Sequence, residues 1–465
     1  MKNVLLAIAA LAVVVYAFYP LESRWKASSP DVTVLQFWHP WTGQYADDLA
    51  EVIAEFNRTH PKIQVNSLFM PTGAGENMKF FVSVAGGVPP DVVFVDGAQV
   101  ASWANMGVLR PLDDLLAAAS VDQAHYFEPS WKQCEYNNKV FAVPAAADPN
   151  FALVWNKDHF RQAGLDPERL PRTISELEEY AQKLTVRDKK GEIERLGFLP
   201  TFVPHGSIAV LTWGWAFGAE FYNEKTQAFT CDDPRAVEAM KWIMRLQNEY
   251  GGQERILNFE AGFGFSAQEP FIQRDLSMSI AYIAYAQDIL RFAPDLDLGI
   301  GPMPVKEGVD LGCEWIGGWT MAIPYGERGN EEEAFELIRW MCADPVGTRY
   351  MALTMKLLPA YRESPFFAKD LAGDLSSKPD IRLMKAFYEI LKRAQRVRPV
   401  SPVSAYYMTE LMRALGRIRN GSKTPEEALR EARDRVTDEW HKSQKRAQAR
   451  HVRAANRAAE TSSGR

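Results

Sequence analysis

The segment VTVLQFWHPWTG, residues Val32–Gly43, decides the fold that the sequence predicts. Its first part, Val32–Trp38, is mostly apolar, which is typical of a buried strand. The overlapping segment Phe37–Gly43 concentrates two indoles, an imidazole and a hydroxyl at a turn. A helix is expected next, because apolar residues recur at helical spacing from Leu49 to Phe56 and Pro61 then stops it.

Two further strands are expected after this helix. Ile63–Leu68 alternates apolar and polar residues, and Asp91–Val95 reads as a buried strand. A β–α–β order predicts an α/β lobe with a largely parallel sheet. Later helices have marked starts, at a capping box beginning with Thr173, at Asp233 and at Thr424.

Length and composition bound the class of protein. A chain of 465 residues suggests two or three domains, and 47% hydrophobic with 24% charged residues excludes disorder for most of it. The formal charge of −6 argues against a nucleic-acid binder that relies on a basic surface. The 13 tryptophans make a stacking site worth seeking.

The N-terminus predicts export. Lys2 precedes the uncharged run Val4–Tyr19, which matches a signal peptide with small residues near Ala17. Sixteen residues of helix span only about 24 Å, short of the roughly 30 Å bilayer core. An uncleaved anchor remains the alternative, and a lipid-modified cysteine is absent, because no cysteine precedes Cys134.

The four cysteines and the C-terminal tail leave alternatives open. The cysteines are Cys134, Cys231, Cys313 and Cys342. Either one of three possible disulfide pairings or isolated buried thiols would fit the sequence. The spacing of these cysteines disfavours a zinc site. The tail His441–Arg465 holds seven Lys or Arg against one acid. It reads as a solvated or disordered extension, with a membrane-surface or partner contact as the alternative.

Candidate ligand-binding side chains follow the predicted strands, where ligands bind in open α/β sheets. The first turn supplies Trp38, His39, Trp41 and Thr42, although Trp38 could be core and His39 a satisfied surface group. Asp96 ends a strand, with a helix N-cap as the alternative, and Asp148 lies between two strands. Charged acceptors in a cleft suit hydroxyl donors.

Three later motifs add further candidates. Trp213 and Trp215 could form a platform or pack in the core. In the segment Trp315–Trp319 the paired glycines would let the backbone approach a ligand. Arg362 could donate to a polar ligand or form a surface ion pair. Phosphate-loop, nucleophile-elbow and zinc-protease motifs are absent from the sequence, so no catalytic residue, cofactor or metal is predicted.

Over residues 31–440 the chain resembles family 1 of the extracellular solute-binding proteins of bacterial ABC importers. This family includes maltose- and glycerol-3-phosphate-binding proteins. The resemblance rests on the order and spacing of six motifs, which are Val32–Gly43, Gly86–Val93, Val108–Asp113, Trp155–Asp158, Gly317–Pro324 and Asn420–Leu429.

The resemblance implies two α/β lobes joined by hinge strands around a central ligand cleft. Lobe one would comprise 31–143 and 285–345, lobe two 144–284 and 346–440, after an N-terminal segment 1–30 and before a basic tail 441–465. The ligand site carried over from the family comprises Trp38, His39, Trp41, Thr42, Asp96, Asp148, Trp213, Trp215, Tyr282 or Tyr285, Gly317, Gly318, Trp319, Arg362, and Tyr406 or Tyr407.

The implied function is a non-enzymatic, periplasmic carbohydrate receptor that delivers its sugar to the permease subunits of an ABC importer. A monomer that binds no nucleic acid is expected. A polyol or glycerol-phosphate ligand, a sensing ectodomain and an exported glycoside hydrolase remain alternatives. The sugar itself is not predicted, because specificity depends on distances within the pocket.

Overall fold

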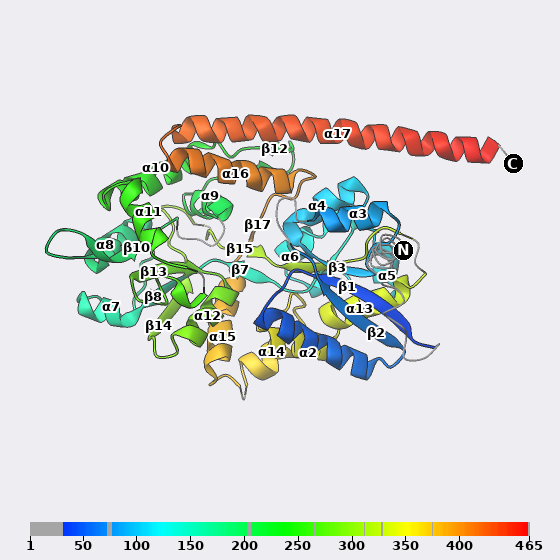
Figure 1. The fold of residues 1–465 in the computed structure, drawn as a ribbon, viewed down its shortest axis with the longest axis horizontal. Helices are drawn as coiled ribbons and strands as arrows, with labels where there is room; N and C mark the ends of the chain where they lie inside the picture. The colour runs from blue at the N-terminus through cyan, green and yellow to red at the C-terminus, as the bar shows by residue number, and fades with distance from the viewer. Residues whose placement is uncertain are drawn as a thin grey trace, which may run out of the picture.

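The computed structural model describes residues 31–71, 77–201, 206–264, 266–310, 312–326, 329–373 and 375–463. The predicted export segment within residues 1–30 lies outside this part of the chain. Two lobes lie side by side, crossing strands connect them, and one long helix runs along an edge of the molecule (Figure 1).

The first lobe contains a five-stranded sheet built around the segment that opens the described chain. Its strand order is β2 (Ile63–Phe69), β1 (Thr33–His39), β3 (Val92–Asp96), β16 (Trp319–Ala322) and β6 (Val143–Pro144). β1 runs parallel to β2 and β3, whereas β16 is antiparallel to β3. The predicted first three strands are confirmed.

Helices cover this sheet. In α2 (Gln44–Thr59) the predicted stripe Leu49, Val52, Ile53 and Phe56 is buried, which confirms the helical spacing. The other helices of the lobe are α3 (Met78–Ala85), α4 (Gly97–Met106), α5 (Asp113–Ala118), α6 (Glu128–Lys132), α13 (Glu331–Cys342) and α14 (Pro345–Met355).

The second lobe has its own five-stranded sheet, in the order β14 (Leu298–Pro302), β8 (Ala152–Asn156), β13 (Leu276–Ala281), β10 (Ile193–Phe198) and β9 (Val186–Arg187). Its helices are α7 (Lys157–Gln162), α8 (Ile174–Leu184), α9 (Gly206–Ala216), α10 (Pro234–Glu249), α11 (Gln253–Ala261) and α12 (Ile283–Phe292). The predicted caps hold, since Thr173 accepts from the Glu176 amide at 3.1 Å and Asp233 from the Arg235 amide at 2.8 Å.

A small sheet joins the lobes. Its strands β17 (Arg396–Val397), β15 (Trp315–Gly317) and β7 (Asp148–Asn150) come from three distant parts of the chain. β7 connects β6 of lobe one to β8 of lobe two, and β15 leads from β14 back to β16. These strands form the hinge, as Figure 1 shows at the centre of the molecule.

Two predicted lobe boundaries need correction. The resemblance places residues 285–345 in lobe one, but β14 pairs along its whole length with β8 and therefore belongs to lobe two. The chain returns to lobe one only at β16. It then stays there beyond residue 345, because α14 packs against α2 and α13. Neither crossing could be located from local patterns, because sheet membership depends on pairing between distant strands.

The last helices extend the second lobe. α15 (Pro379–Leu391) packs against α12, and α16 (Ser404–Arg419) packs against α9 and α17 (Pro425–Ser463). The tail continues α17 as a helix to Ser463. Of the two predicted forms, a solvated or a disordered extension, the helix is compatible only with the solvated one. In the described part of the chain, no helix is long and apolar enough to cross a bilayer.

The four cysteines are buried free thiols, so isolated thiols rather than disulfides are confirmed. Burial raises the pKa of each thiol.

Candidate ligand cleft

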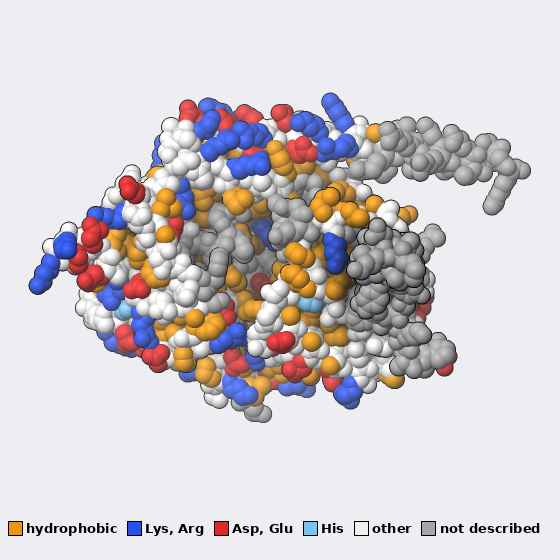
Figure 2. Space-filling view, viewed as in Figure 1, with side chains coloured by type: hydrophobic (Ala, Val, Ile, Leu, Met, Phe, Trp, Pro, Cys, Tyr) orange, Lys and Arg blue, Asp and Glu red, His pale blue; other side chains and the backbone are white. Residues whose placement is uncertain are grey.

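A cleft of about 310 Å³ lies between the two lobes, against the hinge sheet. Figure 2 shows the surface hollowed at this place. Its lining combines aromatic rings with a few polar groups and comes from both lobes and the hinge: Trp41, Tyr45, Asp96, Asp148, Asn150, Phe151, Ile208, Tyr282, Ile283, Ala284, Trp315, Gly317, Gly318, Trp319, Leu357 and Arg398.

Two indoles form the wall on the side of lobe one. Trp41 follows β1 and Trp319 begins β16, so the carboxyl end of one strand lies near the start of another. Their rings meet edge to face, with centroids 5.7 Å apart and planes at 68°. Trp41 also packs edge to face on Phe94, at 4.5 Å. Because both indoles are only half-buried, each presents ring surface to the cleft.

Rings from the hinge and lobe two form the opposite wall. Phe151 lies 6.4 Å from Tyr282 and 6.1 Å from Trp315, measured between ring centroids. Tyr282 stands directly before α12, and the Trp315 indole donates to the Thr212 hydroxyl at 3.3 Å. The hydrogen bond fixes the Trp315 ring, so the wall has a defined orientation.

Asp96 and Arg398 form an ion pair at the base of the cleft. The Arg398 guanidinium donates to both carboxylate oxygens, in one case at 3.0 Å, and lies 5.0 Å from the centre of the Trp315 ring. The same carboxylate accepts from the Ala98 amide at 3.2 Å, so Asp96 is also the N-cap of α4. The cap and the cleft position are therefore compatible.

Asp148 and Arg398 are the cleft-lining groups with spare hydrogen-bonding capacity, because the Asp148 Oδ1 and Arg398 Nε atoms are buried without a partner among the described residues. Asp148 begins β7. Burial, with a smaller contribution from the Asp96 charge, raises the pKa of Asp148 to about 7. A ligand hydroxyl reaching its Oδ1 atom would supply the missing hydrogen bond.

Gly317 and Gly318 line the cleft, but glycine is required at these positions because of close contacts within the hinge. Gly318 has φ +129°, and a Cβ there would sit 2.2 Å from the Ala146 carbonyl oxygen. A Cβ on Gly317 would lie 2.7 Å from the Asn150 amide nitrogen. The backbone between β15 and β16 therefore passes so close to Ala146 and Asn150 that only glycine fits at both positions.

Two polar contacts join the lobes. The Tyr45 hydroxyl on α2 donates to the Ala284 carbonyl of α12 at 3.4 Å. On α6 of lobe one, Lys132 pairs with Glu224 of lobe two. Separation of the lobes would break both contacts.

Seven of the predicted site residues line the cleft: Trp41, Asp96, Asp148, Tyr282, Gly317, Gly318 and Trp319. The other predicted residues lie outside it. On β1, Trp38 packs in a separate core cluster beneath Lys79, whose ammonium is 4.8 Å from the ring. His39 is 5% exposed, and burial lowers its pKa to about 4. Thr42 is exposed.

The predicted tryptophan pair of α9 is core. Trp213 is fully buried and donates to the Pro200 carbonyl at 2.9 Å. Trp215 is also buried and lines a different cavity, of about 250 Å³, on the side of β17. The helix directs both indoles inward, which the alternative of core packing anticipated.

The remaining predicted residues pack elsewhere. Tyr285 is buried in α12, where Glu269 is near its hydroxyl. The exposed Arg362 places its guanidinium 6.0 Å from the Phe127 ring. Tyr406 is half-buried against the core, and Tyr407 is fully buried and donates to the Phe221 carbonyl at 2.8 Å.

Sequence reasoning missed several lining residues. Trp315 belongs to the segment Trp315–Trp319, so its indole could have been predicted as a cleft residue together with Trp319. Tyr45 is a half-buried residue in the first turn of α2, with nothing to mark it. Arg398 lies 302 positions from its partner Asp96, a separation that no local pattern reveals. The described residues contain no group of three or more metal-ligating side chains.

Two α/β lobes, a hinge sheet in which β7 and β15 pass between them, and a central cleft lined by aromatic rings define a bilobal ligand-binding protein. Residues 29–347 match the family of bacterial extracellular solute-binding proteins, and the chain belongs to that family.

The relatives include receptors for different solutes. The chain is 21% identical to a maltotriose-binding protein of Pyrococcus abyssi, over 61% of this chain and 57% of that protein. It is 22% identical to the sn-glycerol-3-phosphate-binding periplasmic protein UgpB of Escherichia coli, over 88% of this chain and 93% of the relative.

A solved structure agrees with the fold. CpMnBP1 with mannotriose bound is 27% identical and superposes with a TM-score of 0.73, over 87% of this chain and all of that one.

Proposed function

We propose that this protein is an extracytoplasmic receptor that binds a mono- or oligosaccharide and delivers it to an ABC importer. The observation that carries this proposal is a cleft lined by aromatic rings from both lobes and by Asp148, whose buried Oδ1 atom has no hydrogen-bond partner among the described residues. Sugar rings present apolar C–H faces, which stack on indoles, and hydroxyls, which donate to carboxylates. Maltotriose and mannotriose binding by relatives supports the same class of ligand.

A glycerol-phosphate ligand is the second candidate, because UgpB aligns with 88% of the chain. The charges in the cleft favour a sugar. Among the described lining residues Arg398 is the only Lys or Arg, and Asp96 already engages it. A phosphate would therefore meet Asp148 without a free cation to balance its charge.

The lining also supports a receptor rather than a glycosidase. Hydrolysis would use two carboxyl groups free to act as acid and as base or nucleophile. Asp96 is held by the guanidinium and by the first turn of α4, which leaves Asp148 alone. We propose in addition that the run Val4–Tyr19 exports the chain to the periplasm and that the receptor acts as a monomer.

The test is a ligand panel of mannotriose, maltotriose, glycerol 3-phosphate and glycerophosphocholine, scored by thermal shift and calorimetry. A sugar at 100 times its dissociation constant should stabilise the protein by about 2.7 kcal/mol. Chromatography after long incubation should recover the sugar intact. Shifts with the phosphate compounds alone would refute the sugar assignment, and release of shorter sugars would refute the receptor role.

A further inference from the structure

The charge of α17 reverses along its length. The first part, residues 425–440, contains six acidic residues and three arginines. The continuation, His441–Arg465, contains seven Lys or Arg and a single acid, Glu460. The whole chain has a formal charge of −6 and this tail one of +6, so residues 1–440 carry −12.

The first part of α17 uses its charges inside the protein. Its ion pairs reach helices α10 and α16 and the turn before α10. They are Glu426 with Lys241 at 2.5 Å, Glu431 with Arg417 at 2.7 Å, Arg435 with Glu410 at 3.3 Å, and Arg433 with Asp232. Figure 2 shows basic and acidic side chains interspersed along this edge. These charges therefore serve to attach the helix to lobe two.

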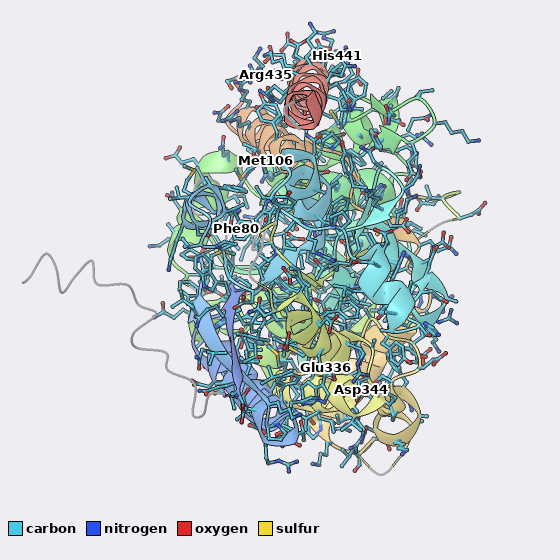
Figure 3. All side chains as sticks on the ribbon, turned by 90° about the vertical axis from the view of Figure 1, so that its right-hand side faces the viewer. Phe80, Met106, Glu336, Asp344, Arg435 and His441 are labelled. Carbon is cyan, nitrogen blue, oxygen red and sulfur yellow. The ribbon has the colours of Figure 1, made fainter. Side chains whose placement is uncertain are left out.

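The basic part has few such partners. Ser443, which accepts from the Asn105 amide at 3.0 Å, is buried, whereas Lys442, Lys445 and Arg446 are exposed. Arg446 pairs with Glu439, but among the described side chains Lys442 and Lys445 have no acidic partner. Beyond this point the helix projects past the body (Figure 1). Figure 3 shows α17 nearly end-on at the edge of the molecule, with its residues Arg435 and His441 labelled.

Helical spacing aligns the cations. Positions 442, 446, 450, 453 and 457 follow one another at intervals of four, four, three and four, within an unbroken helix. At 100° per residue these positions fall within an arc of about 80°, and they extend over about 22 Å. The result is one basic stripe along one face.

The helix itself does not account for this stripe. Cations favour the C-terminal end of a helix only within its last turn, and the last turn of α17 contains none. The tail is rich in alanine, and Val452 is its only bulky aliphatic residue. Attraction at a charged surface, without insertion of an apolar face, is therefore the interaction available to it.

We propose that the basic stripe docks on the anionic headgroups of a phospholipid bilayer. Charge complementarity selects this partner, because a planar anionic surface can meet all the aligned cations at once. The acidic body is repelled from the same surface, so docking through the tail keeps the body at a distance from it. The presence of a membrane beside the protein rests on the proposed function, but the interaction itself does not.

The test is co-sedimentation of the full chain with vesicles, of phosphatidylcholine alone or with about 30% phosphatidylglycerol. The wild type should bind the anionic vesicles more tightly, and at about 1 M salt the difference should vanish, because charges are then screened within about 3 Å. The uncharged run Val4–Tyr19 would bind neutral and anionic vesicles equally, because its affinity does not depend on headgroup charge. The difference in affinity between them therefore reports the tail.

Two matched variants locate the effect. K442Q/R446Q/R450Q/R453Q/R457Q keeps good helix formers but should weaken anionic binding by at least about 100-fold, since each cation contributes roughly fivefold. R446K/R450K/R453K/R457K keeps the charge and should bind as the wild type does. Circular dichroism should show equal helicity in all three proteins.

Several outcomes would overturn the proposal. They are equal partitioning of wild type and glutamine variant, equal binding to neutral and anionic vesicles, tail-dependent self-association without vesicle binding, and binding of duplex DNA without vesicle binding. Sugar titrations separate this proposal from the proposed function. The glutamine variant should bind sugar normally, and a wild type that binds vesicles but no sugar would refute only the receptor.

Discussion

Replacing Asp148 with asparagine tests the electrostatics of the cleft most directly. The pKa of this carboxyl rises from 3.8 to about 7 in the folded protein, chiefly because burial disfavours its charge. One pKa unit corresponds to about 1.4 kcal/mol, so the rise represents up to about 4 kcal/mol. Partial exposure of the side chain reduces this, and we expect about 2–3 kcal/mol.

The sign follows from the raised pKa. Because the folded protein holds this proton more tightly than the unfolded chain, the contribution of Asp148 to stability is fully present below about pH 4. It is lost as the pH rises through 7. Between pH 4 and 8 the wild type should therefore lose about 2–3 kcal/mol of unfolding free energy relative to Asp148→Asn, measured by urea denaturation without ligand.

Sugar binding should show the opposite trend. Hydroxyl donors favour the ionised carboxylate, so wild-type affinity should increase from pH 5 to 7, by at most tenfold per pH unit. The asparagine variant should bind weakly, with a flat pH profile. Calorimetry in buffers of different ionisation enthalpy should detect proton release only for the wild type.

The control is Asp297→Asn, which changes an exposed aspartate outside the cleft that pairs with Arg161. Its pH profiles of stability and affinity should follow those of the wild type. Parallel stability profiles for wild type and Asp148→Asn would show that the Asp148 carboxyl titrates normally, and the argument from burial would then be wrong.

Three further substitutions probe the walls and the closure of the cleft. Trp319→Ala should cost about 2 kcal/mol of binding free energy, roughly thirtyfold in affinity, measured by calorimetry. Trp213→Ala should instead cost about 3–5 kcal/mol of unfolding free energy, measured by denaturation, and leave sugar binding by the folded protein intact. The reverse pattern would show that the ligand site lies elsewhere. Arg398→Met should lower the unfolding free energy by about 2–3 kcal/mol by leaving Asp96 without its guanidinium, and an unchanged denaturation midpoint would contradict this. Tyr45→Phe removes a hydrogen bond between the lobes, so sugar affinity should fall by a few-fold and small-angle scattering should report a larger unliganded radius of gyration; identical scattering would show that this bond does not hold the lobes.

Local patterns were enough to predict the elements of the fold. The apolar spacing of α2 and the caps at Thr173 and Asp233 depend on neighbours within a few residues, and the structure has them as predicted. The crossing points were missed because they depend on which distant strands pair, as β14 does with β8. Periodicity indicates that a strand exists but not which sheet contains it.

The same limit explains the site. Trp41, Asp96 and Trp319 lie at strand ends, where position along the chain already indicates proximity to the cleft. Trp213 and Trp38 also lie in tryptophan-containing motifs, but their side chains are buried in the core. Whether such a side chain is buried depends on how its helix or strand packs against its neighbours. Arg398 has no local signal, because its function comes from a carboxylate contributed by the opposite end of the chain.

The repeated passage of the chain between the lobes has a consequence for folding kinetics. Neither lobe is a continuous segment, and the sheet of lobe one remains incomplete until β16 arrives, so that Thr320 can donate to the Val95 carbonyl 225 positions earlier. Such a topology has a high contact order, which slows folding. A nascent chain emerging from the ribosome cannot complete its first lobe until more than two thirds of its length is synthesised. It therefore remains unfolded long enough to be handled as an extended polypeptide.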